Sequence, residues 1–237
     1  MRVFVTGAST GLGALAARDL QGGGHKVVVH VRRPSQAPPG GTTWLGIVTG
    51  DLADLDQTRA VAERADAYGR FDAVIHNAGV LAPSSAFAVN VVAPYVLTAL
   101  MTKPARLVYV SSAVHQHGSR DLLRIDRGQV TYEDSKLYVT ALAMACASRW
   151  PGTVSHAVDP GWVPTRMGGA DAPDDLTAGY ETQVWLATHD VAPRSGSYWY
   201  HRAAERSHPA THDPRFQRAL LRVLQDRTGI RLDDRAV

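Results

Sequence analysis

The sequence is poor in cysteine, and this scarcity excludes several chemistries at once. Cys146 is the only thiol among 237 residues, so neither a disulfide within the chain nor a thiolate metal cluster can form. Such usage is typical of a reducing compartment, and we expect the protein in the cytoplasm. The ten histidines are scattered without the spacing of metal ligands, so no metal site is expected.

Long apolar runs and concentrated charge are also missing. No stretch is expected to be long enough for a membrane span, and the apolar start of the chain is too short for a signal sequence. The net charge of +3 is spread along the chain instead of gathering in a tail or stripe. Despite a pI of about 9.2, this distribution argues against a nucleic-acid partner and leaves a small molecule as the expected one.

What the chain does contain is an alternation of short apolar runs and longer helical segments. Strands are predicted at 3–6, 26–31, 45–48, 71–75, 107–111, 154–158 and 197–200. Helices are predicted at 12–20, 54–68, 84–101, 132–149 and 214–227, the third of them kinked at Pro94. Continuous apolar strands need burial on both faces, so the pattern predicts an α/β fold: a Rossmann-type doubly wound parallel sheet of about seven strands with helices on both faces.

The length favours one domain over two. Residues 1–237 are therefore predicted to form a single Rossmann-fold domain that combines dinucleotide binding and catalysis. Within it, about 162–190 is the expected substrate loop, with a short and open lid at 166–175, and about 201–237 is a C-terminal extension. The segment PSQAPPGG at 34–41 is interpreted as a surface loop and not as a linker.

A glycine-rich turn opens the first helix. Gly7 permits a tight turn, Gly11 lets the backbone approach a pyrophosphate, and Gly13 allows the helix to pack closely on the strand. The unpaired N–H groups and the positive dipole end of the helix would then face the anion. The turn lies between a strand and a helix, which favours a dinucleotide site over an ordinary loop.

The spacing T-G-x-x-x-G-x-G, from Thr6 to Gly13, resembles the short-chain dehydrogenase/reductase family, and further family elements follow in order up to residue 165. Asn77-Ala78-Gly79 matches the end of the family's Asn-Asn-Ala-Gly motif, with His76 in place of the first Asn. Pro160-Gly161 begins a segment that resembles the family's Pro-Gly-x-x-x-Thr. The joint occurrence, more than any single motif, carries the resemblance.

The resemblance implies a catalytic tetrad of Asn90, Ser112, Tyr132 and Lys136, with Ser111 as the alternative if the serine register differs by one. Tyr132 and Lys136 lie one helical turn apart and so face the same ligand. A free tyrosine ionises near pH 10, and a nearby ammonium brings it towards useful acid–base range. Ser112 would stabilise growing negative charge on the substrate oxygen. The resemblance further implies that Asn90 holds a proton-relaying water and that Lys136 bonds the nicotinamide ribose.

The cofactor is predicted to be NADP(H). The second strand ends in Arg32-Arg33, with no carboxylate to accept a ribose hydroxyl, and arginine suits the extra phosphate. Arg32 is the preferred principal contact. By resemblance, cofactor contacts are assigned to Gly7, Ser9, Thr10, Gly11, Leu12, Gly13, Arg32, Arg33, Asp51, Leu52, Asn77, Ala78, Gly79, Tyr132, Lys136, Pro160, Gly161, Val163 and Thr165.

The expected function is reduction of a carbonyl, or oxidation of a secondary alcohol. His115, His117, Trp162 and Arg166 are candidates for the pocket wall. The tail from Ser197 is similar to retinol-dehydrogenase-like family members, which favours a bulky hydrophobic ketone or aldehyde, such as a polyketide or terpenoid intermediate of secondary metabolism.

Three alternatives to a carbonyl reductase are a sugar epimerase or dehydratase of the family's extended branch, a non-catalytic NADP-binding redox sensor, and a nucleic-acid-binding protein. The chain leaves little room for the larger C-terminal domain that the first needs, and the retained Tyr–Lys pair speaks against the second. Family members often pair through the helices that start near Ser84 and Tyr132. A homodimer or homotetramer is therefore an open expectation, unless the tail covers that surface.

Overall fold

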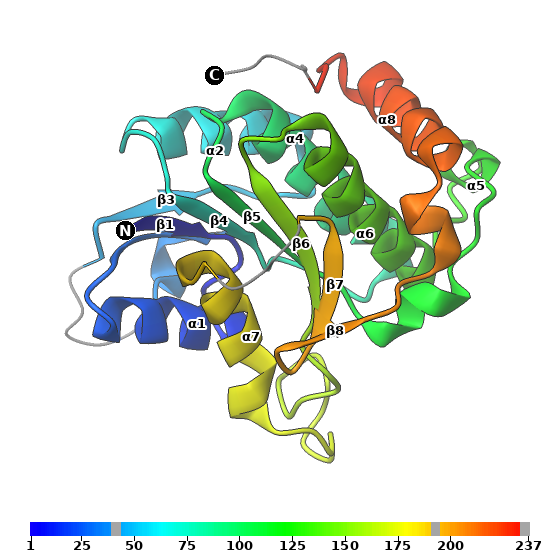
Figure 1. The fold of residues 1–237 in the computed structure, drawn as a ribbon. Coiled ribbons are helices and arrows are strands. Elements are labelled where there is room, and N and C mark those ends of the chain that lie inside the picture. The colour runs from blue at the N-terminus through cyan, green and yellow to red at the C-terminus, as the bar shows by residue number, and fades with distance from the viewer. Residues whose placement is uncertain (39–43, 191–194, 233–237) are drawn as a thin grey trace.

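In a computed structural model of the protein, which describes residues 1–38, 44–190 and 195–232, one sheet of eight strands runs in the order β3-β2-β1-β4-β5-β6-β7-β8. The strands are β1 (Arg2–Val5), β2 (Lys26–Val31), β3 (Gly46–Thr49), β4 (Ala73–His76), β5 (Arg106–Val110), β6 (Val154–Asp159), β7 (Ser197–Tyr200) and β8 (Ala203–Glu205). The first seven are parallel, and β8 runs antiparallel to β7 (Figure 1). The α/β prediction is confirmed.

Helices cover both faces of this sheet. They are α1 (Gly11–Gly22), α2 (Leu55–Asp66), α3 (Pro83–Phe87), α4 (Ala93–Leu100), α5 (Leu123–Asp126), α6 (Tyr132–Arg149), α7 (Leu176–Thr188) and α8 (Pro214–Thr228). In Figure 1, α1 and α7 lie on one face, and α2, α4 and α6 lie on the other. Val3 and Val5 join the core under α1 and α7, whereas Phe4 between them joins the opposite core. The double burial explains why the strands are apolar without alternation.

The strand order reverses between β1 and β4. The chain runs outward from β1 to β3, then crosses back to build β4, β5 and β6 on the other side. In open α/β sheets, ligands bind beyond the carboxyl ends of the strands at such a reversal. The glycine turn after β1 and the loops after β4, β5 and β6 all lie at this edge.

The predicted helix at 84–101 forms in three parts. Between α3 and α4, residues Ala88–Val92 make one π-helical turn that contains Asn90. Pro94 follows directly, and its ring lacks an N–H and crowds the preceding turn, which accounts for an irregularity at this point. The expected disturbance near Pro94 is therefore present as a wider helical turn.

Three elements lie outside the predictions: β8, α7 and the short helix α5. The eighth strand, β8, has three exposed residues and no apolar pattern. It is joined to β7 by His201 and Arg202 at positive φ (44° and 63°), where a sequence reading expects glycine. Helix α7 fills much of the predicted substrate loop and is capped by Asp175, whose carboxylate accepts from Ala178 N at 2.7 Å. In the predicted loop at 34–41, Pro34–Gln36 form a 3-10 turn, and residues 39–41 lie outside the described part of the chain.

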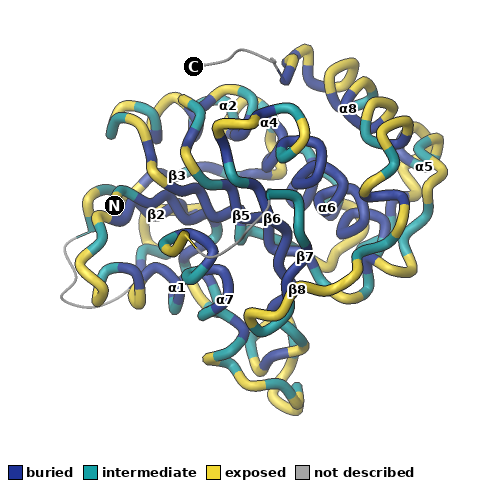
Figure 2. The backbone as a smooth tube through the Cα atoms, viewed as in Figure 1, coloured by how far each residue is buried: buried dark blue, intermediate teal, exposed yellow. Residues whose placement is uncertain are grey.

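Helix α6 is buried on every side. All residues from Asp134 to Cys146 are buried, and Figure 2 shows the helix dark blue between the sheet and α8. Phe216 of α8 packs against Tyr138 of α6, with ring centroids 6.1 Å apart. The C-terminal extension thus covers much of the surface through which pairing along α6 was expected.

The segment Pro83–Leu100 corrects one expectation. It has 18 residues with a mean hydropathy of 1.3, which is long and apolar enough for a membrane span by length and composition. Of that segment, 56% is buried inside the protein, where α4 packs against α2 and the sheet. The run was overlooked because Pro94 and Asn90 interrupt it, and its burial is typical of a core helix.

Candidate active site

The glycine turn leaves no room for a side chain at Gly7 or at Gly13. Gly7 and Gly11 have φ of +66° and +61°. A Cβ on Gly7 would lie 2.7 Å from the Ala78 Cα, and one on Gly13 would overlap the Asn77 amide and lie 2.6 Å from the Gly7 carbonyl. Thr10, which caps α1, makes no side-chain bond to the first turn. The N–H groups of that turn therefore face outward without a side-chain cap, as an anion site requires.

Neighbouring strands hold the turn in place. Asn77 Nδ2 donates to the carbonyls of Thr6 (3.0 Å) and Gly7 (3.3 Å), and the backbone N–H of Ala78 donates to Thr6 Oγ1 (3.0 Å). His30 supports it from β2, because its Nδ1 accepts from Gly7 N (3.2 Å) while its Nε2 lies 2.9 Å from Gly50 O. Burial lowers the pKa of His30, which keeps the ring neutral for this double contact. Sequence reasoning gave His30 no role.

The outer end of the predicted cofactor groove is polar and open. Arg32 and Arg33 follow β2 and are both exposed. After β3, Asp51 accepts from the Ala53 N–H at 3.0 Å in a local turn, and Leu52 is buried beneath it. The structure brings these residues to the edge that carries the glycine turn.

Tyr132 and Ser112 meet where β5 and α6 converge. Ser112 lines the same cavity as the Tyr132 phenol, and its side chain interacts with the phenol so as to lower the pKa of Tyr132. Ser111 is buried, and its Oγ lies 2.6 Å from Thr140 Oγ1. Of the two serines left open by the sequence, Ser112 is therefore the one that faces the phenol. Burial first, and the charge of Asp159 second, raise the pKa of Tyr132 to about 12, and the Ser112 side chain opposes them.

Lys136 lies under the phenol. Its Nζ donates to the Val110 carbonyl at 2.9 Å and sits 5.4 Å from the Tyr132 ring centroid. Only 4% of the residue is exposed. Burial lowers the pKa of Lys136 to about 8, and the carboxylate of Asp159 works against that decrease.

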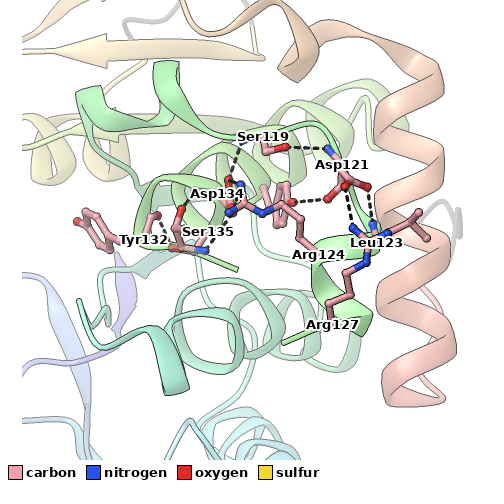
Figure 3. A network of polar contacts seen from close by, with 10 residues as sticks. Ser119, Asp121, Leu123, Arg124, Arg127, Tyr132, Asp134 and Ser135 are labelled. Carbon is pink, nitrogen blue, oxygen red and sulfur yellow. Dashed lines mark hydrogen bonds and ion pairs between the residues drawn. The ribbon is translucent and has the colours of Figure 1, made fainter. Parts of the chain in front are cut away.

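A capping box fixes where α6 begins and thus where Tyr132 points. Thr131 Oγ1 accepts from Asp134 N (3.2 Å), and Asp134 Oδ2 accepts from Thr131 N (3.0 Å). Arg124 pairs with the buried Asp134 carboxylate at 3.2 Å, and Ser119 N donates to it at 2.7 Å, as Figure 3 shows. Helix α6 starts at Tyr132 because this network satisfies its first turn.

Asn90 connects the π-helical turn to α6. Its Nδ2 donates to Ser135 Oγ (2.9 Å), and Ser135 in turn donates to the Tyr132 carbonyl (2.7 Å). Its Oδ1 accepts from Val80 N at 2.8 Å. The side chain therefore ties the loop after β4 to the first turn of α6.

The loop after β6 carries the remaining predicted contacts. Gly161 has a φ of +79°, and Pro160, Val163 and Thr165 line the cavity with it. The Thr165 side chain would lie 3.7 Å from a Cβ on Gly11, so it stands above the glycine turn. His76, the departure from the family motif, stacks on Tyr109 at 4.7 Å beneath the site.

A cavity of about 570 Å³ opens beside Tyr132. Its apolar wall comes from Leu12, Leu81, Val114, Trp162, Val163 and Met167, and its carboxylates come from Asp159, Asp174 and Glu205. Of the four candidates for the wall, Trp162 lines it. His117 and Arg166 are exposed outside it, and His115 is buried behind Ser112, bonding its carbonyl at 2.8 Å. Within the described ranges no group of three metal-ligating side chains is found.

Sequence comparison identifies the family. The family model for short chain dehydrogenases matches residues 1–175. An uncharacterized oxidoreductase of Emericella nidulans is 36% identical over 97% of this chain and 98% of its own length. The short-chain dehydrogenase chry4 of Gibberella zeae is 35% identical over 98% of both chains.

Solved structures share the fold. An uncharacterized protein from Mycobacterium paratuberculosis superposes with a TM-score of 0.82 at 23% identity, covering 98% of this chain and 94% of that one. A short chain dehydrogenase from Shigella flexneri, complexed with NADP, superposes with a TM-score of 0.69 at 21% identity, covering 85% and 97%. This chain belongs to the short-chain dehydrogenase/reductase family of oxidoreductases.

Proposed function

We propose that this protein is an NADPH-dependent carbonyl reductase in which Tyr132 is the proton donor. The observation that carries the proposal is the contact between Ser112 and the Tyr132 phenol, with the Lys136 ammonium one helical turn away, at the wall of the cavity. Acid, hydrogen-bond donor and cation converge at the carboxyl edge of the sheet, where this fold binds its ligands.

The chain's own residues fit a dinucleotide. The first turn of α1 has no side-chain cap, and the glycine turn could not accept a Cβ at Gly7 or Gly13. Arg32 and Arg33, in place of an acidic residue at the end of β2, suit the additional phosphate of NADP. Thr165, above the glycine turn, and Asn77, below it, would enclose the phosphates and ribose. NADP is also the ligand of the Shigella flexneri relative.

When bound, the cofactor supplies the hydride. Tyr132 gives its hydroxyl proton to the substrate oxygen, and Ser112 donates a hydrogen bond to the same oxygen as negative charge grows on it. The Lys136 ammonium stabilises the phenolate left behind. Asn90 fixes the start of α6 through Ser135, so that the phenol keeps its position.

The cavity supports a bulky hydrophobic carbonyl as substrate. Its wall is mostly apolar, with Leu81, Val114, Trp162 and Met167 surrounding the approach to Tyr132. An intermediate of secondary metabolism remains our preferred substrate type. We also keep the predictions of one Rossmann-fold domain and of a cytoplasmic location. The tail over α6 favours a monomer over the dimer or tetramer first considered.

The test follows oxidation of NADPH and NADH by the purified protein against ketones, aldehydes and quinones of different size. We expect turnover with NADPH, highest for bulky apolar ketones, and a loss of roughly a hundredfold or more in kcat for Tyr132→Phe. NADPH affinity, measured by fluorescence titration, should change only a few-fold in that variant. Cofactor binding without any turnover would contradict the proposal and favour a redox sensor.

A further inference from the structure

A buried carboxylate, Asp159, shares the cavity of the Tyr132 phenol. Asp159 ends β6 and is 5% exposed. Its Oδ1 accepts from Gly161 N at 2.9 Å, and its Oδ2 accepts from the Tyr198 hydroxyl at 3.0 Å. Burial and Asp159 raise the pKa of Tyr198 well above its ordinary range, so this hydroxyl stays a donor. The carboxylate is thereby held in one orientation and is largely buried.

The charge of Asp159 acts on both catalytic groups in one direction. It adds to burial in raising the pKa of Tyr132, and it opposes burial at Lys136. In both cases a nearby negative charge retains a proton on the neighbour. Lys136 needs this support, because its ammonium donates its hydrogen bond to the neutral carbonyl of Val110.

The other polar groups around Asp159 do not cancel this effect. His115 packs on Tyr198 at 4.5 Å, and its Nε2 accepts from His208 N at 3.1 Å. That leaves Nδ1 as the donor to the Ser112 carbonyl at 2.8 Å, so the ring is neutral. The ionisable groups that face Asp159 or share its cavity come from α6, the 3-10 helix after β5, β7, β8 and the loop after β6. They are Tyr132, Lys136, His115, Tyr198, Tyr200, Glu205 and Asp174. Among these described groups, Lys136 alone is cationic at neutral pH.

We propose that Asp159 is a positioning residue that acts through Tyr132 and Lys136, keeping both protonated across neutral pH and so committing the site to carbonyl reduction. In reduction, the carbonyl carbon gains a hydride from bound NADPH and the carbonyl oxygen gains the Tyr132 proton, leaving a phenolate that takes a proton from solvent. Oxidation of an alcohol needs the phenolate at the outset. The direction of the reaction rests on the proposed function, whereas the proton balance of the pair does not.

The proton balance is measured without turnover. In cofactor-free protein labelled with ¹³C-tyrosine, the Cζ resonance of Tyr132, assigned by its loss in Tyr132→Phe, is followed by NMR against pH. In Asp159→Asn, the midpoint of the Tyr132 titration should lie at a pH lower by about one unit. Tyr198→Phe is the matched control, since it removes a partner of the carboxylate but keeps the charge. Its titration should stay in place or move to higher pH.

The pH profile of reduction gives the second readout. For kcat/KM of NADPH-dependent reduction, the alkaline limb should move down by about one unit in Asp159→Asn, and the ratio of alcohol oxidation to reduction at pH 7 should increase. In Tyr198→Phe the limb should not move down.

An unchanged titration in Asp159→Asn would overturn the inference. So would an equal downward shift in both variants, because only a general loosening of the site moves both alike. If Asp159→Asn does not fold, a downward shift in Tyr198→Phe alone overturns it. A shifted titration in a protein that reduces no carbonyl would leave the inference intact and reject the proposed function.

Discussion

The edge of the sheet at the carboxyl ends of the strands has two halves, which consist of different chemical groups. Around β1, β2 and β4 the edge consists mainly of backbone, a glycine turn held by Asn77 and His30. Around β5, β6 and β7 it consists of ionisable side chains: Tyr132, Lys136 and Asp159. The first half suits the phosphates of a cofactor, which take no part in the reaction, and the second suits chemistry in which protons move. Substitutions should therefore act by shape in the first half and by charge in the second.

The largest effect is expected at the glycine turn. In Gly13→Ala, the new methyl would overlap Asn77 and the Gly7 carbonyl, so the turn must open. We expect a loss of about 1–3 kcal/mol in the free energy of unfolding and loss of NADPH binding. The control is Gly22→Ala at the other end of α1, where a Cβ meets nothing within 4 Å and stability should hold or rise slightly. Urea unfolding and fluorescence titration measure both, and equal effects at the two sites would contradict the shape argument.

The difference between the two halves also explains which site residues can be recognised from the sequence. Glycines at a fixed spacing define the turn locally, so a short stretch of sequence is enough to identify Gly7, Gly11 and Gly13. The sequence did not indicate a role for Asp159, because the role we propose depends on a contact with Tyr198, 39 residues further along the chain. It did not indicate a role for His30 either, since the contact of His30 with Gly7 spans 23 residues. β8 was missed because three exposed residues carry no pattern, and it forms only where β7 already offers an edge.

Two buried histidines, one in each half, allow a test of how burial makes the stability of the protein depend on pH. His76 in β4 and His156 in β6 have pKa values lowered by burial to about 3 and about 4. In the described structure, Nδ1 of His76 and Nε2 of His156 have no hydrogen-bond partner, so protonation would bury an uncompensated charge. The unfolded chain protonates near pH 6.5, so stability is complete above that pH and is lost as pH falls towards 4 and then 3.

We expect the free energy of unfolding to decrease by about 1.4 kcal/mol per pH unit for each histidine between pH 6 and pH 4.5. His76→Asn and His156→Gln should each reduce the slope of the free energy of unfolding against pH by about 1.4 kcal/mol per pH unit. This reduction is expected whatever the variant's stability at pH 8. Denaturant unfolding at several pH values measures this. A slope that neither variant changes would mean that other groups govern acid unfolding.

A smaller effect is expected on the preference for NADPH over NADH, which depends on the half around β1, β2 and β4. Arg32→Ala removes the guanidinium assigned to the extra phosphate of NADP, and bonds of this kind contribute about 1.5–3 kcal/mol. We expect the KM for NADPH to rise by about tenfold or more and the KM for NADH to change little. Arg33→Ala should give the weaker version of the same change. If Arg32→Ala affected both cofactors equally, the arginine would not be reading the phosphate.

The smallest effect is expected from the charge of the substrate, which meets the half around β5, β6 and β7. The described cavity wall carries Asp159, Asp174 and Glu205 but no lysine, arginine or histidine, so a substrate carboxylate there meets only like charge. A bulky keto acid should therefore have a lower kcat/KM than its methyl ester. Glu205 is exposed, and a single exposed charge pair contributes about 0.2–1 kcal/mol, so Glu205→Gln should narrow the difference in kcat/KM by about 1.4- to fivefold. Added salt should narrow it in the wild type and have little effect in the variant, because only exposed charges are screened. A keto acid preferred over its ester would show that this half of the edge recognises substrates by something other than its carboxylates.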